Sequence, residues 1–118
     1  MNSLDLKEVY TPWGFWVTLY YDHQTWTKIL TILPGESTSL HRHKYRAEYW
    51  TPLDKGLSAS IGGHRFLDLD LGKRYDVMRE SWHRIENRST HPASLIEVAI
   101  GTPSEHDVER KEDKYGRE

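Results

Sequence analysis

The sequence predicts an all-β fold, a single barrel built from short strands, and three observations support this. Gly, Pro and Asp residues that favour turns recur at short intervals along the chain. The runs between them are rich in β-branched and aromatic residues, which suit strands. No stretch of eleven or more residues shows a helical stripe of apolar side chains. The 118 residues are enough for one core, so we expect one domain over 1–118.

Four strands are expected from these runs, over residues 15–21, 26–33, 57–61 and 94–100. Gly62 and Gly63 separate 58–61 from 64–69 and predict a hairpin, because glycine supplies the positive φ angles of a tight turn. The tail over about 104–118 is very polar, and the sequence leaves open whether it forms a short helix or an extended arm.

Composition narrows the classes of function. The formal net charge is -2 and charged residues make up 29% of the chain, which argues against a nucleic-acid binder. The chain has no cysteine, so neither a disulfide nor a thiolate metal site is expected. Residues 1–9 include Asp5, Lys7 and Glu8 without an apolar run, and no segment approaches the roughly 18 apolar residues of a membrane span. We therefore expect a cytoplasmic protein that does not engage a membrane.

Residues with metal-ligating side chains gather in two segments. Alternate side chains of a strand face the same way, so His41 and His43 point together while Arg42 points away. Glu48 follows the turn-like segment 44–47, and the next strand can return its carboxylate to the same pocket. Downstream, the same alternation groups His83 with residues 85 and 87 on one face of a strand.

Three imidazoles and one carboxylate suit a borderline divalent ion. We predict that His41, His43, Glu48 and His83 hold one divalent metal ion, which is Mn, Fe, Co, Ni or Zn. The alternative is a barrel in which these groups form a hydrogen-bonded polar core. The other four histidines lie beside turn residues and are expected to be ordinary surface residues; they are His23, His64, His91 and His106.

The first of these segments resembles a signature of the cupin superfamily. In that signature a glycine precedes His-x-His and a glutamate follows it. Gly35, His41, His43 and Glu48 match this pattern. The resemblance implies a cupin barrel, a double-stranded β-helix of the jelly-roll type.

The second segment resembles the other cupin signature, in which a glycine and a Pro-x-Gly turn precede a histidine and an asparagine. Gly72, His83 and Asn87 match it. Met78 and Glu80 replace the proline and the glycine of the turn, so the turn before His83 departs from the family pattern.

Most of the chain also resembles the cupin domain of type II mannose-6-phosphate isomerases, a module fused to a mannose-1-phosphate guanylyltransferase in bifunctional enzymes. Five segments match in order: 12–14, 46–50, 83–87, 95–98 and 112–117. The nucleotidyltransferase half is absent from the sequence, so guanylyl transfer is not expected. The family usually has glutamine in place of His41 and histidine in place of Tyr45.

This resemblance implies a metal-dependent aldose–ketose isomerase that converts mannose-6-phosphate to fructose-6-phosphate. Glu97 is the candidate general base, with its orientation left open. Lys28 aligns with a lysine common in the family and is the candidate to hold a sugar hydroxyl or a phosphate. The alternative for Lys28 is a solvated lysine on an edge strand.

Arginines are the candidates to hold the phosphate group. The resemblance favours Arg46, Arg84 and Arg117, with Tyr45 as a further substrate-binding residue. Arg84 alternates away from His83, which favours a position outside the barrel or at a subunit contact. A homodimer is expected because small cupins commonly pair through sheet edges. The alternative function is a non-catalytic sugar-binding or regulatory cupin, or a metal cupin with another small-molecule substrate.

Overall fold

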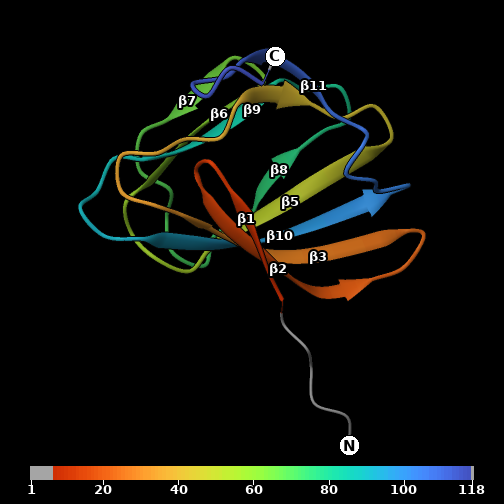
Figure 1. Cartoon of the computed structure of the whole chain (residues 1–118), viewed down its shortest axis with the longest axis horizontal. Helices are drawn as coiled ribbons and strands as arrows, with labels where there is room; N and C mark the ends of the chain where they lie inside the picture. The colour runs from red at the N-terminus through yellow and green to blue at the C-terminus, as the bar shows by residue number, and fades with distance from the viewer. Residues whose placement is uncertain (1–6, 118) are drawn as a thin grey trace, which may run out of the picture.

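The computed structural model describes residues 7–117, which form eleven strands in two facing antiparallel sheets (Figure 1). The larger sheet has the order β1-β2-β3-β10-β5-β8, formed in that order by Glu8–Thr11, Gly14–Tyr21, Thr25–Ile32, Ala93–Gly101, Arg46–Pro52 and Tyr75–Val77. The smaller sheet has the order β11-β4-β9-β6-β7, formed by Glu109–Glu112, Leu40–Arg42, His83–Asn87, Leu57–Ile61 and His64–Phe66.

The all-β prediction is confirmed, since residues 7–117 contain strands and turns but no helix. Within this described range there is accordingly no helix that could cross a membrane. The strands expected over 15–21, 26–33, 57–61 and 94–100 correspond to β2, β3, β6 and β10, with ends that differ by no more than one residue. The segment expected as a turn over 44–47 is shorter, because Arg46 and Ala47 already belong to β5.

The glycine pair forms the predicted hairpin between β6 and β7. Gly62 and Gly63 have φ angles of 56° and 86°, which suit the two central positions of a type I′ turn. The second strand of the hairpin is shorter than expected and ends at Phe66. Of the two alternatives for the tail, the extended arm is correct: β11 pairs with β4 at the edge of the smaller sheet.

Burial alternates along β3, β5, β9 and β10, as expected for strands with one face toward a core. Paired residues lie opposite one another on the same face of a sheet. One inward row across β3, β10 and β5 is therefore apolar and consists of Leu30, Leu95 and Pro52. The next inward row consists of Lys28, Glu97 and Trp50. The interior thus has an apolar part and an adjoining polar part, and the polar part contains the candidate site.

The apolar part is closed by large side chains from both sheets. Trp50, Ile32, Leu57 and Leu95 are completely or almost completely buried and belong to one cluster. Burying each such side chain stabilises the fold by roughly 1.5–3 kcal/mol. Asn87, at the end of β9, donates hydrogen bonds to the carbonyl oxygens of residues 32 and 91 and ties the two sheets together at this end.

Candidate metal centre

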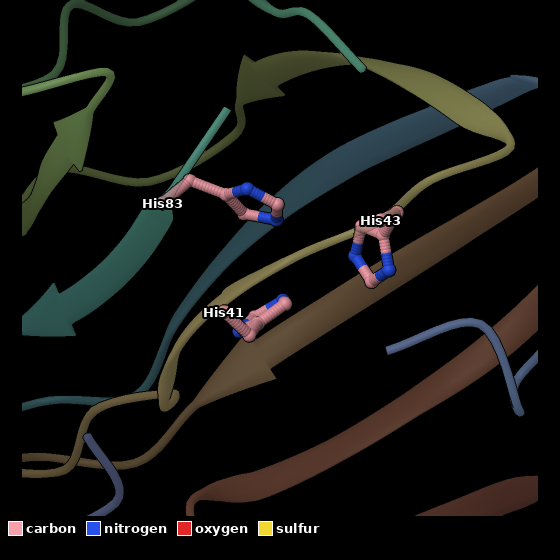
Figure 2. Close-up of side chains that lie close together, drawn as sticks. All are labelled: His41, His43 and His83. Carbon is pink, nitrogen blue, oxygen red and sulfur yellow. The ribbon is translucent and has the colours of Figure 1, made fainter. Parts of the chain in front are cut away.

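Three imidazole rings turn toward one another inside the barrel (Figure 2). His41 lies on β4 opposite His83, the first residue of β9, and His43 follows β4 directly. The ring centroids are 4.3 Å apart for His41 and His83, and 5.1 Å apart for His43 and His83. One ring nitrogen from each histidine lies within 4.8 Å of the others, so the three could hold one metal ion.

Each of these rings is oriented by a backbone carbonyl on the side away from the cluster. The Nδ1 atoms of His41 and His83 lie 2.8 Å from the carbonyl oxygens of Ser39 and Ser81, two residues earlier in the chain. The Nδ1 atom of His43 lies 2.6 Å from the carbonyl oxygen of Asp107. A carbonyl oxygen only accepts hydrogen bonds, so each Nδ1 carries a proton. The Nε2 atoms of all three rings therefore face the cluster. Nε2 of His43 lies 3.1 Å from Nη2 of Arg46, a donor that a bound metal ion would displace.

Glu48 lies against the same rings. Its Oε2 atom is 3.2 Å from Nε2 of His43, and its Oε1 atom is 3.5 Å from Nε2 of His83. The carboxylate also accepts hydrogen bonds from Nε of Arg46 at 2.9 Å and from Nε1 of Trp50 at 3.1 Å. Glu48 is thus held in one orientation beside the cluster, with Arg46 as its neutralising cation.

Burial and charge set the protonation states needed for ligation. Burial holds the pKa of the His41 imidazole well below its usual value of 6.5, and burial lowers the pKa of His83 to about 4. Burial alone would raise the pKa of Glu48, but contacts with His43 and Arg46 outweigh it and hold that pKa well below 4.5. At neutral pH His41 and His83 are therefore neutral and Glu48 is ionised, the forms that bind metal.

These residues fit a divalent metal ion better than a closed polar core. Among the described residues, Nε2 of His83 is buried and has no hydrogen-bond partner. A hydrogen-bonded core would satisfy this atom, because an unpaired buried polar group costs roughly 1–3 kcal/mol. A metal ion would accept its lone pair.

A cavity of about 330 Å³ adjoins the cluster. His41 and His43 contribute to its wall, and so do Lys28, Arg46 and Glu97. A volume of this size falls within the usual range for small-molecule sites. The polar row on β3 and β10 therefore faces the same space as the histidines.

The Glu97 side chain points inward and is almost fully buried. Burial, followed by the nearby negative charge of Glu48, raises the pKa of Glu97 to about 7. Lys28, its partner on β3, is also buried, and its Nζ atom lies 3.8 Å and 4.2 Å from the ring centroids of Trp26 and Trp16. The alternative of a solvated edge-strand lysine is wrong, because β3 lies between β2 and β10.

The tail contributes two further cations to the cavity wall, Arg110 and Arg117. The guanidinium of Arg117 forms a two-pronged ion pair with Asp113, at 2.9 Å and 3.0 Å. Nε of Arg110 is buried without a hydrogen-bond partner among the described residues, and burial together with the charge of Arg117 lowers its pKa. No local sequence pattern indicates a role for Arg110, because its position depends on the pairing of β11 with β4. His106, expected at the surface, is exposed but also lines the cavity.

Two of the predicted substrate-binding residues do not line this cavity. Arg84 lies on the outer face of β9, where its Nε atom donates to the carbonyl oxygen of Thr38 and Nη1 lies 3.4 Å from Glu112. Tyr45 is exposed and lines a separate outer cleft of about 620 Å³. A substrate-binding role for either residue stays a prediction that these positions do not favour.

Two facing sheets around an inward cluster of histidines define a cupin. The fold is similar to that of an RmlC-like cupin from Shewanella frigidimarina, with a TM-score of 0.75 and 14% identity, covering 86% of this chain and 88% of that one. Residues 2–113 match the family described as mannose-6-phosphate isomerase C-terminal. The chain belongs to this family.

Relatives of this chain are bacterial biosynthetic proteins. The alginate biosynthesis protein AlgA of Pseudomonas putida is 35% identical over 111 residues, which cover 93% of this chain and 23% of AlgA. The mannose-1-phosphate guanylyltransferase ManC of Salmonella typhimurium is 35% identical over 112 residues, which cover 94% of this chain and 23% of ManC. The chain thus spans about a quarter of the length of these relatives.

Proposed function

We propose that this chain is a metal-dependent isomerase that interconverts mannose-6-phosphate and fructose-6-phosphate. One observation supports the proposal most. A single cavity is lined by two of the clustered histidines, by the buried carboxyl of Glu97 and by several cations. Such a cavity would offer one small substrate a metal ion bound to the histidines, an acid–base group and cations for a phosphate group. Membership of a family described by this isomerase supports the choice of sugar phosphate.

The histidine cluster supports the metal-binding part of this proposal. His41, His43 and His83 would hold a divalent ion, with Glu48 as the fourth candidate ligand; Mn, Fe, Co, Ni and Zn all suit such a set. When bound, the ion supplies a Lewis acid for the carbonyl and neighbouring hydroxyl oxygens of a sugar.

The proposed reaction requires one proton to move between adjacent carbon atoms. Glu97 takes the proton from C2 of the aldose and returns it to C1, while the proton of the C2 hydroxyl moves to the C1 oxygen. Aldose and ketose then differ only in the positions of these two hydrogens. Lys28 lies opposite Glu97 in the sheet and binds a sugar oxygen in this scheme.

Arg110 and Arg117 are the proposed seat for the phosphate group. Burial and the neighbouring charge of Arg117 disfavour the positive charge of Arg110, and an anion bound between the two guanidinium groups would relieve this repulsion. The side chain of Arg117 is also held in place by its ion pair with Asp113. Charge-assisted hydrogen bonds to phosphate are among the stronger hydrogen bonds in proteins.

We further propose that the protein acts in the cytoplasm and as a homodimer.

The test is an isomerase assay on the protein loaded with each candidate metal. Glu97→Gln is expected to lower kcat by about 100-fold or more, the range typical for a general base. His83→Ala is expected to abolish both turnover and metal binding. Arg110→Ala is expected to raise KM for mannose-6-phosphate more than it lowers kcat, because phosphate binds equally in the ground and transition states.

Glu86→Gln is the control, since Glu86 lies on the face of β9 that points away from His83 and pairs with Arg88. It should retain the activity of the unchanged protein. Stoichiometric metal without any turnover would refute the isomerase assignment. Sugar-phosphate binding without turnover would then support a binding or regulatory cupin, and no binding would support a different substrate.

A further inference from the structure

The three histidines of the cluster are not oriented in the same way. His41 and His83 each donate to a carbonyl two residues earlier, so the chain directly before each residue orients its ring. His43 instead donates to the carbonyl oxygen of Asp107, which lies 64 residues away in the chain. The orientation of His43 therefore depends on a tertiary contact with the C-terminal segment.

The same residue anchors that segment through its side chain. The carboxylate of Asp107 accepts hydrogen bonds from the backbone amides of Lys44 at 3.0 Å and Tyr45 at 2.8 Å. These are the two residues that follow His43. The backbone amide of Thr102 donates to the carbonyl oxygen of Tyr45 at 2.8 Å and fixes the other end of the segment. Residues 102–108, which we name the strap, are thus bound to the loop that begins at His43.

The strap is also a wall between two spaces. His106 and Val108 line both the inner cavity beside the histidines and the outer cleft. Asp107, between them, makes all three hydrogen bonds to residues 43–45. A loosened strap would open the inner cavity and free the His43 ring in the same movement.

We propose that Asp107 is a positioning residue that locks His43 into the orientation needed for metal binding and couples this orientation to closure of the strap. The inference rests on the proposed metal centre, but it concerns a residue that is not a candidate ligand and does not line the cavity beside the histidines. Partners that orient a ligating histidine typically change metal affinity by 10–100-fold when they are removed.

The first measurement is Co²⁺ affinity by titration calorimetry, together with the visible absorption spectrum of the Co²⁺-loaded protein. Asp107→Ala is expected to weaken Co²⁺ binding by 10-fold or more and to change the spectrum, because His43 is no longer held as a ligand. Asp107→Asn retains one side-chain oxygen, which can accept one of the two backbone hydrogen bonds, so it is expected to keep part of the affinity and a spectrum closer to the original. If Asp107→Ala does not fold, the Co²⁺ affinity and spectrum of Asp107→Asn test the proposal in its place.

Asp22→Ala is the matched control. Asp22 likewise accepts two backbone amides, those of Gln24 at 2.8 Å and Thr25 at 2.7 Å, in the turn between β2 and β3. It lines neither cavity. Asp22→Ala is expected to lower stability without changing Co²⁺ affinity or the spectrum. Equal Co²⁺ affinity in Asp107→Ala and Asp22→Ala would overturn the proposal.

A second measurement does not need the metal. In the metal-free protein the Nδ1 proton of His43 is buried in a hydrogen bond, so its NMR signal should exchange slowly with water. The signal is expected to persist in Asp22→Ala and to be lost in Asp107→Ala. If the unchanged protein binds no Co²⁺, the metal centre is refuted and this signal alone decides the role of Asp107; its persistence in Asp107→Ala would refute that role.

Discussion

Glu80 has a backbone conformation that its side chain disfavours. It is the one non-glycine residue with positive φ among the described residues, at 64°. The cupin signature has a glycine at this position, and the turn forms here despite the replacement. The amide of Glu80 donates to the carbonyl oxygen of His43 at 2.7 Å, so this strained turn connects β8 and β9 to the loop that contains a candidate ligand.

Replacing this residue with glycine should therefore stabilise the protein. A left-handed conformation costs an ordinary residue roughly 1–2 kcal/mol, and the greater freedom of glycine in the unfolded chain offsets part of the gain. We expect Glu80→Gly to raise the free energy of unfolding by up to about 1 kcal/mol in urea denaturation. Glu80→Ala, which keeps the strain, is the control, and equal stability of the two variants would contradict this explanation.

At the scale of elements, the end of β10 packs closely against the start of β5. Gly101 has a φ of 139°, and a Cβ atom added there would lie 2.3 Å from the carbonyl oxygen of Tyr45. The strap begins directly after this residue. Its docking on the loop after His43 therefore depends on the absence of a side chain at the end of β10.

Gly101→Ala should be more harmful than an alanine at another glycine of positive φ. We expect it to lower the free energy of unfolding by about 2 kcal/mol more than Gly72→Ala, because overpacking against backbone adds to the conformational strain. Gly72 has a φ of 74° with no atom within 4 Å of an added Cβ. Chemical denaturation of both variants checks the difference; similar losses would show that strain, and not the collision, dominates.

The stability of the protein should depend on pH in part through an ion pair in the C-terminal arm, which contains β11. The hydrogen bond from Arg117 lowers the pKa of Asp113 to about 2, against an opposing effect of burial. The unfolded carboxyl has the higher pKa, so this contribution is complete above about pH 4 and is lost as the pH falls toward 2.

Asp113→Asn should remove that dependence. We expect the variant to be less stable than the unchanged protein by about 1 kcal/mol at pH 7, a value reduced by solvent screening of the partly exposed Arg117. The difference should shrink toward zero as the pH is lowered from 4 to 2. Urea denaturation at several pH values measures it, and a constant difference would exclude the ion pair as its cause.

At the scale of the whole molecule, metal binding and folding are linked. The candidate ligands come from β4, β5, β9 and the loop after β4, so the site exists only when both sheets are assembled. A ligand that binds only the folded state stabilises it by an amount set by its concentration relative to Kd.

Thermal denaturation should therefore depend on metal. At Co²⁺ concentrations of about 100 times Kd, we expect about 2.7 kcal/mol of added stability, with a corresponding rise in Tm that a chelator reverses. His83→Ala should show neither effect. A rise of similar size in His83→Ala would place the bound Co²⁺ outside the histidine cluster.

The sequence by itself determined β2, β3, β6 and β10, the glycine hairpin and the grouping of residues on common faces. These are local properties: side chains alternate along a strand, and glycine permits positive φ, whatever the rest of the chain does. For this reason the sequence alone groups His41 with His43, and His83 with Asn87.

Only the tertiary structure decided which faces enclose the interior and which distant residues meet there. Alternation groups Lys28 with Leu30 but does not say that Glu97 lies opposite, because the register of β3 and β10 joins segments far apart in the chain. The same holds for Arg110 and for Asp107, whose tail pairs with β4 from the other end of the sequence. Such contacts depend on how the whole chain packs. The polar row, the arginines of the proposed phosphate seat and the anchor of His43 therefore became visible only in the folded barrel.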